Sequence, residues 1–512
     1  MDIKAKLSEE FNLKPAYAAN IVDLIEEGNT IPFIARYRKE MHGGQSDELL
    51  RDFSDRLTYL KNLTARKDEV RASIEGQGKW TDELAAALDK AVTLTEVEDV
   101  YRPYKQKKKT RASVAVERGL EPLADIIFAQ EMKECDLAAL ASEYIDEEKD
   151  VASAEDAING AKDIIAERVS DDAEIRKALR EFIMEEGTVS SAFNDKQEDK
   201  EKLNVYEMYK EFSEKIKTLP SHRILALNRG EKDECLKVTV ACDNDRAVEK
   251  IKAKFMKPSA FDKEMSEAIE DSYDRLIFPS IEREVRNELT DKANEQAIKM
   301  FEVNLKPLLM QPPLKGKVII GLDPAYRTGC KIAVIDQSGN MLDHTVIFPT
   351  PPQNKTEEAK RVMLGLIKKY NADVISIGNG TASKESEIFV ADLIKDCPRK
   401  VQYMVVNEAG ASVYSASKLG TEEFPNEGVT VRSAVSIARR LMDPLAELIK
   451  IDVKSIGVGQ YQHDMPQKRL TEVLEGVVED CVNSVGVDLN TASYSLLAYV
   501  SGLNTSIAKN IV

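Results

Sequence analysis

The sequence predicts a multidomain, predominantly α-helical protein that carries one α/β domain. Its 512 residues, 43% of them hydrophobic, are enough for several domains of roughly 100–200 residues each. Apolar residues recur at three- and four-residue spacing through most of the chain, which indicates amphipathic helices. The stretch from Lys317 to about Ile451 differs, because apolar strand-like segments alternate there with helical ones.

The region from Ile3 to about Lys217 has the helical pattern throughout. Glycines interrupt it at intervals, as helix ends would. The apolar spacing is clear at Ile21, Leu24 and Ile25, and again at Leu49, Leu50, Phe53, Leu57 and Leu60. An array of helices of this kind usually serves as a scaffold.

The segment from Arg223 to Val240 departs from the helical pattern. Two apolar-rich strings, RILALN and CLKVTV, are separated by the polar string GEKDE. This pattern predicts a β-hairpin set into helical surroundings. Helical spacing returns from Glu264 to Leu309, and Gln311-Pro312-Pro313 then marks a boundary, because proline disfavours helix in the residue before it.

The α/β domain begins with an apolar strand, VIIGLDP, that ends at an acid. CKIAVIDQ and MLDHTVIF follow across Ser338-Gly339-Asn340 and predict an antiparallel hairpin. The strands DVISIGNG and VQYMVVNE come next, each after a predicted helix. The predicted helices are Thr356 to Tyr370, Ser383 to Asp396, Ala411 to Leu419 and Val431 to Lys450. This element order is that of the ribonuclease H and RuvC-like fold.

The chain after Ile451 is helical again. Two apolar helices, Ser493 to Val500 and Thr505 to Val512, flank the turn Ser501-Gly502-Leu503-Asn504. No cap or polar tail follows the last helix, so we expect a truncated product. The predicted segments are residues 1–220 (helical), 221–315 (hairpin plus central helices), 316–450 (α/β domain) and 451–512 (helical linker and one helical hairpin).

The formal net charge of −17 argues against a protein that coats nucleic acid by bulk charge. The charge is unevenly spread, however, because residues 131–174 hold 15 acidic and 4 basic side chains. We expect this acidic segment to form an exposed helical surface away from the C-terminal hairpin and from the basic run described below.

Targeting and metal signals are not visible in the sequence. No stretch approaches the ~18 consecutive apolar residues of a membrane span, and the N-terminus has no secretory pattern. The six cysteines form no C-x-x-C pair, and four histidines are too few and too dispersed for a zinc site. We therefore expect reduced cysteines in a cytosolic protein without a membrane partner.

Three acids of the α/β domain are the candidate catalytic residues. Asp323 ends the first strand, Glu408 ends the fifth, and Asp443 lies on the last long helix. If they converge, they could hold two Mg²⁺ ions for phosphodiester hydrolysis. Alternatively, Asp323 caps a turn, Glu408 faces solvent and Asp443 caps the helix that begins at Pro444. Asn379 stands at the end of the fourth strand, where a nuclease of this fold would need an acid.

The string G-N-G-T-A-S between a strand and a helix also has two interpretations. It could cradle a phosphate at the N-terminus of the helix that begins at Ser383. It matches neither G-x-G-x-x-G nor a Walker A loop. The other interpretation is a tight turn in which Ser383 is the N-cap.

The C-terminal hairpin is a candidate nucleic-acid contact. Two short helices joined by a turn with glycine present backbone N–H groups to a phosphate without reading bases. Gly502 lets the backbone come close and Lys509 could add a charge. An ordinary αα-hairpin explains the same pattern.

The run from Tyr101 to Arg111 is a second candidate contact. It mixes six basic residues with two tyrosines, which suits a phosphate backbone with stacked bases. A solvated loop is the usual explanation of a charge run. Its candidate nucleic-acid-binding residues are Lys105, Lys107, Lys108, Lys109 and Arg111.

Three arginines lie on the last helix of the α/β domain. Arg432 lies near the start of the helix, and Arg439 and Arg440 could line the same face of the domain as Asp323. Arg439 and Arg440 could equally pair with Glu447 or Asp443 in ordinary surface bridges.

These motifs closely resemble one family, the bacterial Tex proteins, which are described as transcription accessory factors. The matching strings run in order from about Asn29 to Asn504. They are NTIPFIARYRKEMHGG, EVEDVYRPYKQKKKTRA, GLDPAYRTGCK, IGNGTAS, VVNEAGASVYSAS, RRLMDPLAELIKIDVKSIGVGQYQHD, VEDCVNSVGVDLNTAS and LLAYVSGLN.

The resemblance implies an N-terminal helical region with a helix-turn-helix-like part, a YqgF/RuvC-like domain and tandem helix-hairpin-helix motifs. The family normally ends in an OB-fold RNA-binding domain, and we expect that domain and the second hairpin to be absent from this sequence. The family's nuclease-like domain is regarded as degenerate. The first acid of that domain is kept as Asp323, whereas Glu408 and Asp443 match the YqgF-type acids only loosely. The family also resembles a eukaryotic transcription-elongation histone chaperone, which implies a scaffold at the transcription machinery.

We therefore predict a cytosolic transcription accessory factor that binds RNA or DNA without catalytic turnover and without a cofactor. Phosphate would be held by Gly502, Leu503, Asn504 and Lys509, and the basic run would widen the positive track. One rival is a Mg²⁺-dependent structure-specific nuclease that uses Asp323, Glu408 and Asp443. Another is a pure protein-interaction scaffold whose helical half docks on polymerase.

Overall fold

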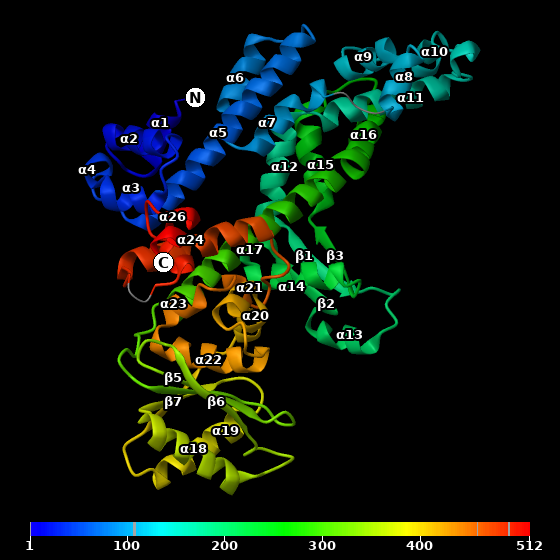
Figure 1. Ribbon diagram of the computed structural model, residues 1–512. Coiled ribbons are helices and arrows are strands. Elements are labelled where there is room, and N and C mark those ends of the chain that lie inside the picture. The colour runs from blue at the N-terminus through cyan, green and yellow to red at the C-terminus, as the bar shows by residue number, and fades with distance from the viewer. Residues whose placement is uncertain (1, 106–108, 458, 490–491) are drawn as a thin grey trace. The chain divides into compact units, whose positions relative to one another are not determined.

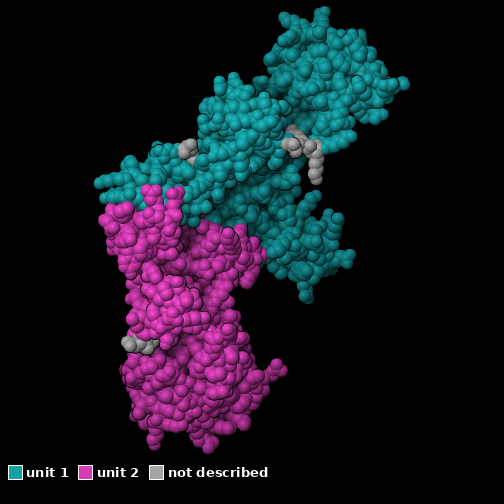
Figure 2. Space-filling model, turned by 45° about the horizontal axis from the view of Figure 1, so that its top comes forward, with its two compact units in different colours: residues 1–22, 52–295 teal, residues 23–51, 296–512 magenta. Residues whose placement is uncertain are grey.

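A computed structural model describes residues 2–105, 109–457, 459–489 and 492–512. The chain forms two compact units (Figure 2), residues 1–22 with 52–295 and residues 23–51 with 296–512. Helices dominate both units, so the predicted multidomain, mainly α-helical class is confirmed. Among the described residues, no helix is both long and apolar enough to cross a membrane. The four predicted segment boundaries stay a prediction.

The first unit is built mainly of helices that bury their apolar faces against one another. Ser, Thr or Asp caps many of them, as at Thr110 before α8 and Ser153 before α11. The helices up to the first strand are α1 (Ile3–Glu10), α2 (Pro15–Glu26), α5 (Asp47–Gly76), α6 (Asp82–Lys90), α7 (Leu94–Tyr101), η1 (Arg102–Tyr104), α8 (Arg111–Glu117), α9 (Glu121–Ala129), α10 (Leu137–Ser142), η2 (Glu147–Lys149), α11 (Ala154–Ser170) and α12 (Ala173–Glu186).

The first unit also contains a three-stranded antiparallel sheet of order β2-β1-β3. The strands are β1 (Thr188–Phe193), β2 (Glu211–Lys215) and β3 (Leu236–Ala241). The other elements from β1 onward are α13 (Lys200–Val205), η3 (Glu207–Tyr209), η4 (Ile216–Thr218), α14 (Ser221–Lys232), α15 (Asn244–Phe255), α16 (Asp262–Asp271), the π-helix η5 (Ser272–Ile277) and α17 (Phe278–Leu309), which continues into the second unit.

The predicted β-hairpin over Arg223 to Val240 is wrong in its first half. RILALN lies in helix α14, and only CLKVTV forms a strand, β3, which pairs with β1. The four residues Ile224 to Leu227 are all buried. A short run that is apolar on every side cannot be assigned to helix or strand by its periodicity. Strands β1 and β2 lie inside the region predicted to be wholly helical.

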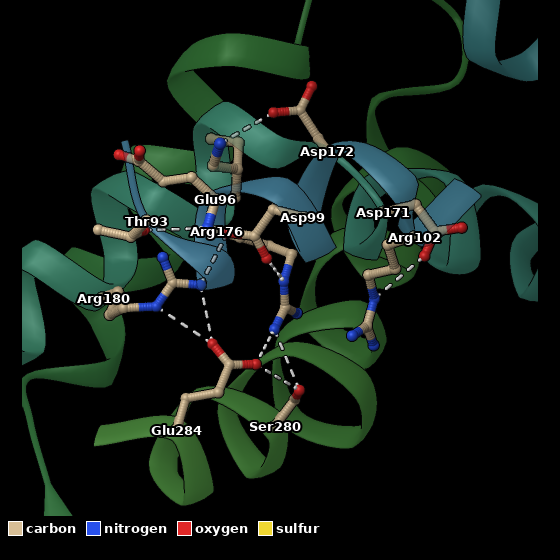
Figure 3. Close-up of polar contacts among 11 residues, drawn as sticks. Thr93, Glu96, Asp99, Arg102, Asp171, Asp172, Arg176, Arg180, Ser280 and Glu284 are labelled. Atoms are coloured by element: carbon tan, nitrogen blue, oxygen red, sulfur yellow. Dashed lines mark hydrogen bonds and ion pairs between the residues drawn. The ribbon is translucent and has the colours of Figure 1, made fainter. Parts of the chain in front are cut away.

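A buried ionic network joins α7, α12 and α17 within the first unit (Figure 3). Arg176, which is fully buried, donates from Nε to Asp99 at 2.9 Å. Arg180 bridges Asp99 and Glu284, at 2.8 Å each, and Ser280 donates to Glu284 at 3.0 Å. Arg176 also binds Glu284 directly. This arrangement, named here the Arg176 network, fixes the helix that leads into η1 and the basic run.

The second unit contains a five-stranded mixed sheet of order β6-β5-β4-β7-β8. Its strands are β4 (Ile319–Asp323), β5 (Cys330–Ile335), β6 (Met341–Ile347), β7 (Val374–Gly378) and β8 (Gln402–Val406). The first three are antiparallel neighbours, while β7 and β8 run parallel to β4. This is the predicted order of an antiparallel hairpin followed by alternating helices and strands, and the ribonuclease H-like domain is confirmed.

Helices cover both faces of this sheet (Figure 1), with α18 and α19 on one side and α22 on the other. Alternate residues of β4 enter the two cores: Ile320 and Leu322 face α18, whereas Ile319 faces α22. A Cβ on Gly321 would overlap the Ala434 carbonyl group of α22. The glycine therefore lets the helix lie close against the sheet.

The remaining elements of the second unit are helical. They are α3 (Ile31–Tyr37), α4 (Lys39–His42), α18 (Thr356–Tyr370), α19 (Ser383–Leu393), η6 (Ile394–Asp396), α20 (Ala411–Ala416), α21 (Lys418–Glu423), α22 (Val429–Met442), α23 (Pro444–Leu448), η7 (Val453–Ile456), α24 (Gln467–Val485), α25 (Tyr494–Leu497) and α26 (Thr505–Ile511). The single helix predicted from Val431 to Lys450 is two helices, because Pro444 begins a new one.

Candidate functional site

Two of the three candidate acids meet at one edge of the five-stranded sheet. Asp323 is the last residue of β4, and Glu408 lies two residues beyond β8. Both strands are parallel to β7, so their carboxyl ends share this edge. Burial raises the pKa of the Asp323 carboxyl, while a hydrogen bond from Ser433 and the charge of Lys331 act against that rise.

Glu408 is held by the glycine loop that follows β7. The Gly380 N–H group donates to its carboxylate, and the Glu408 N–H group donates to Asn379 Oδ1 at 3.0 Å. A Cβ on Gly378 or Gly380 would overlap the carboxylate, so only glycine leaves this space open. The loop considered as a phosphate cradle therefore holds a carboxylate of its own chain.

One interpretation of the sequence was that Glu408 faces solvent, and the structure differs from it. Its carboxyl is half-buried, and Oε2 is buried without a hydrogen-bond partner. Burial, and secondly the negative charge of Asp323, raise the pKa of Glu408, while Gly380 and Arg440 partly compensate. Two carboxyl groups that each disfavour the other's charge can take up a proton or a cation between them.

Asp443 does not join this pair. Its Oδ1 caps α23 by accepting from the Ala446 N–H group at 3.1 Å, and Lys315 Nζ lies 3.9 Å from Oδ2. Ser433 is the residue of α22 that reaches Asp323, and Asp443 lies ten positions further on, about 15 Å at the helical rise. The expected convergence of three acids is wrong, and the capping interpretation holds for Asp443.

The described part of the chain contains no group of three or more His, Cys, Asp or Glu side chains placed to hold a metal ion. Asp323 and Glu408 supply two carboxylates. The neighbouring positions from β7 and α22 are Asn379 and Ser433, which are neutral ligands and bind divalent cations more weakly. The edge can therefore attract a cation without enclosing it.

The helix that follows the glycine loop is not capped as expected. The N-cap of α19 is Ala382, with φ of +63°, and no side chain caps the helix. Ser383 is the first helical residue, because Ala382 takes the left-handed conformation that ends the turn.

The arginines of α22 are buried and serve the domain itself. Arg432 binds the carbonyl groups of Ser415 and Phe424, and Arg440 binds those of Asn407 and Ala409, both at 2.7 Å. Arg439 pairs with Glu423 at 2.6 Å. These hydrogen bonds and the ion pair lie inside the domain, and the charge of Arg440 acts against the rise of the Glu408 pKa.

The C-terminal hairpin has the geometry that its sequence predicts, with a shorter first helix, α25. Gly502 has φ of +89°, and Asn504 caps α26 by accepting from the Ile507 N–H group at 2.9 Å. Asn483 of α24 fastens the turn, because its Oδ1 accepts from the Ser501 N–H group at 2.9 Å. The Lys509 ammonium lies 5.1 Å from the centre of the Tyr494 ring, and Leu503 is partly exposed.

The basic run is described only in part, since Lys107 and Lys108 lie outside the described residues. Lys105 and Lys109 are exposed and lie 3.6 and 3.9 Å from Glu98 and Glu117, which are loose ion pairs. Arg111 begins α8 and is exposed.

The acidic segment is not separate from the basic run, contrary to expectation. Thr110 at the end of the run donates to Glu167 of α11 at 3.0 Å, and the charge of Arg111 acts on Asp163. Helix α11 packs against α8 through an apolar face, and this packing carries its acids beside the run.

Two contacts of Asp323 were not predicted. Lys331 lies directly opposite it in the β4–β5 register, and Ser433 reaches it from α22. The strand pairing could have identified Lys331, because the predicted hairpin brings those two strands together. Ser433 could not be identified, since its position depends on how α22 crosses the sheet.

The geometry defines a class of protein: a mostly helical, multidomain chain with a ribonuclease H-like domain and a C-terminal helical hairpin. Family models match along its length. They are the Tex-like protein N-terminal domain at residues 1–75, the Tex central region at 133–301, the Tex protein YqgF-like domain at 317–442 and a helix-hairpin-helix motif at 482–512.

Relatives match over the whole chain. Uncharacterized protein YdcI of Bacillus subtilis is 51% identical, and this chain spans 71% of its length. Transcriptional accessory protein Tex of Neisseria gonorrhoeae is 42% identical, with 67% of its length spanned. S1 RNA-binding domain-containing protein 1 of Homo sapiens is 36% identical, with 52% spanned. The chain belongs to the Tex family, as its motifs predict.

Proposed function

We propose that this chain is a cytosolic transcription accessory factor that binds RNA or DNA through phosphate groups, independently of sequence, and acts as a scaffold without catalytic turnover. Membership of the Tex family supports nucleic-acid binding in general. The name of the Neisseria relative points to transcription, and that of the human relative points to RNA. The transcription machinery is the partner that these relatives suggest.

The observation that carries the proposal is the C-terminal hairpin. Gly502 takes a left-handed conformation in the turn, and Asn504 caps the second helix, so backbone N–H groups are grouped at one exposed corner. Such groups bind phosphate without reading bases. Lys509 on the next turn of α26 supplies a charge, and Lys105, Lys109 and Arg111 supply others in the first unit.

The absence of turnover is supported by the acidic edge. Nuclease chemistry with two metal ions needs converging carboxylates. Asp323 and Glu408 converge, whereas Asp443 caps a helix and Asn379 is neutral.

A salt titration tests binding. The affinity of mixed-sequence RNA and DNA oligonucleotides is measured by fluorescence anisotropy at 50 and 200 mM salt. With about three phosphate contacts, binding weakens by roughly 20- to 40-fold between these concentrations. Lys509→Ala reduces the salt slope, while Lys468→Ala, which removes a 93% exposed charge from α24, leaves it unchanged. Tight binding with no salt slope contradicts the proposal.

A second candidate is a Mg²⁺-dependent structure-specific nuclease. One observation favours it: Glu408 Oε2 is buried without a hydrogen-bond partner, and Asp323 raises the pKa of that carboxyl. Branched DNA and structured RNA are incubated with the protein in Mg²⁺ or Mn²⁺. Cleavage that disappears in Asp323→Asn establishes this function instead of the first.

A further inference from the structure

Helix α3 carries two aromatic side chains that are in contact with each other. Phe33 and Tyr37 are four positions apart, so they lie on one face of the helix, and their ring centres are 5.4 Å apart. Ile34 and Ala35, which lie between them in the sequence, are buried in the second unit. Phe33 is partly buried, whereas Tyr37 is 54% exposed. The pair therefore presents aromatic surface to solvent.

Two cations follow these rings directly in the chain. The Arg38 guanidinium carbon lies 5.0 Å from the centre of the Phe33 ring, and Arg38 Nη1 donates to the Tyr37 carbonyl oxygen at 2.9 Å. Lys39 is the first residue of α4 and is exposed. Among the described residues, no acid forms an ion pair with Arg38 or Lys39. We name this surface the Tyr37 platform and define it by Phe33, Tyr37, Arg38 and Lys39.

A buried histidine fixes the shape of the platform. His42 of α4 is fully buried, and its Nε2 lies 3.1 Å from the Ile34 carbonyl oxygen of α3. The Gln45 N–H group donates to His42 Nδ1 at 2.9 Å, so the neutral ring donates from Nε2. Burial lowers the pKa of His42, which keeps the ring neutral and both bonds intact near pH 7. Helices α3 and α4 therefore hold the rings and the cations in one arrangement.

The platform and the C-terminal hairpin are supported by the same helix. Helix α3 packs against α24 (Figure 1), and Asn483 of α24 accepts from the Ser501 N–H group in the turn of the hairpin. All these elements belong to the second unit. Exposed rings, unpaired cations and the backbone N–H groups of the hairpin thus occur together in one compact part of the chain.

We propose that the Tyr37 platform stacks an unpaired base of single-stranded nucleic acid on the Tyr37 ring while Arg38 and Lys39 bind neighbouring phosphates. The inference rests on the proposed function and extends it to a surface and to the form of the nucleic acid. Exposed aromatic rings with cations beside them are the usual means of binding single strands, whose bases offer free faces. The hairpin in the same unit favours nucleic acid over an acidic peptide, which would match the two cations equally well.

Three probes of equal length separate base contacts from phosphate contacts. They are a 12-nucleotide oligodeoxyadenylate, a 12-unit abasic strand, which carries phosphates without bases, and a 12-base-pair duplex, whose bases are already stacked. Binding of each labelled probe to the protein is measured by fluorescence anisotropy. Tyr37→Ala raises the Kd of the oligodeoxyadenylate by about 5- to 100-fold, the range for loss of one stacked base. The Kd values of the other two probes stay within about twofold of the parent values, which also shows that the variant is folded.

Matched variants separate the ring from its surroundings. Tyr37→Phe keeps the ring and binds the oligodeoxyadenylate as the parent protein does. Tyr326→Ala, which removes a 37% exposed tyrosine elsewhere in the second unit, leaves its Kd unchanged. Lys39→Ala weakens the binding of all three probes, because they share the phosphates. Lys418→Ala, which removes a 91% exposed charge from α21, weakens none of them.

The outcomes distinguish this inference from the proposed function. A Tyr37→Ala variant that binds the oligodeoxyadenylate like the parent protein overturns the platform, and so does an equal loss for the abasic strand. A Tyr37→Phe variant as weak as Tyr37→Ala also overturns it. In each of these cases the parent protein still binds nucleic acid, and the proposed function stands. No binding of any probe by the parent protein overturns both.

Discussion

At the residue scale, Arg176 shows how strongly a buried charge depends on its partners. Its side chain is fully buried, and its guanidinium binds Asp99, Ser280 and Glu284. Arg176→Ala leaves two carboxylates buried with Arg180 as their remaining cation. We expect this to cost about 3–5 kcal/mol, measured as a lower transition temperature of the first unit in calorimetry.

Arg283→Ala is the control, because Arg283 lies on α17 beside Glu284 but is exposed. The control variant should unfold within about 0.5 kcal/mol of the parent protein. Equal losses in both variants would mean that helix composition, and not the Arg176 network, sets the stability of this region.

Asp323 gives a prediction about pH. Burial raises its pKa and that of Glu408, so the folded protein binds more protons than the unfolded chain. Stability therefore falls as pH rises from the ordinary carboxyl value of about 4 through the raised values. Asp323→Asn removes one buried charge and, with it, the repulsion that acts on the Glu408 carboxylate. We expect the free energy of unfolding to rise by on the order of 1 kcal/mol at pH 7 and to vary less with pH.

Asp343 in the same domain provides a comparison, because its pKa shift has the opposite sign. Hydrogen bonds from Lys369 and Tyr370 lower its pKa, so its contribution to stability is present above the unfolded value and is lost as pH falls. Asp343→Asn therefore destabilises at pH 7. Thermal unfolding from pH 4 to 7 checks both variants, and a loss of stability at pH 7 in Asp323→Asn refutes the prediction.

At the scale of elements, the loop after β7 depends on glycine for steric reasons. A Cβ at Gly380 would overlap the Glu408 carboxylate. Gly380→Ala should destabilise the domain by about 1–3 kcal/mol, the usual cost of overpacking. Adding Glu408→Ala removes the overlap and recovers most of the loss. Chemical denaturation of the single and double variants measures this coupling, and additive losses would contradict it.

The sequence predicted the elements of the α/β domain well. The five strands of the second sheet and helix α18 appear where expected. Strand β2 was missed because its residues, EFSEK, are charged and half-exposed at a sheet edge. Helix α14 was mistaken for a strand because its apolar residues are contiguous and all buried.

The candidate site was predictable to the same degree. Strand ends shared by one sheet edge brought Asp323 and Glu408 together, as parallel pairing requires. The prediction for Asp443 was wrong because its position depends on where α22 ends. Pro444 ends that helix at the opposite end of the sheet, near Lys315, which precedes β4. The glycine loop binds Glu408 through a backbone N–H group, and residue types alone do not specify the direction of that group.

At the scale of the whole molecule, the net charge of −17 does not describe any one surface. Within the first unit, Glu167 and Asp163 of the acidic segment lie beside the basic run. Their charges reduce the local positive potential around the run.

The second unit is assembled from segments far apart in sequence, since residues 23–51 belong with residues 296–512. Arg51, at the start of α5, binds Asp480 of α24 at 2.6 Å and the Gly476 carbonyl oxygen at 3.1 Å. A Cβ on Gly476 would lie 2.7 Å from Arg51 Nη1, so the glycine makes room for this contact. The N-terminal segment is therefore a structural part of the C-terminal unit.

Arg51→Ala should loosen the second unit and spare the first. The pair is partly buried, with 27% and 22% of the two side chains exposed, so we expect a loss of about 2 kcal/mol, between the values for surface and buried pairs. Calorimetry that resolves two transitions should show one lowered. Asp480→Asn should lower the same transition, whereas Lys468→Ala, an exposed change on α24, should lower neither. A shift of the other transition, or of both equally, would show that residues 23–51 are held by the first unit instead.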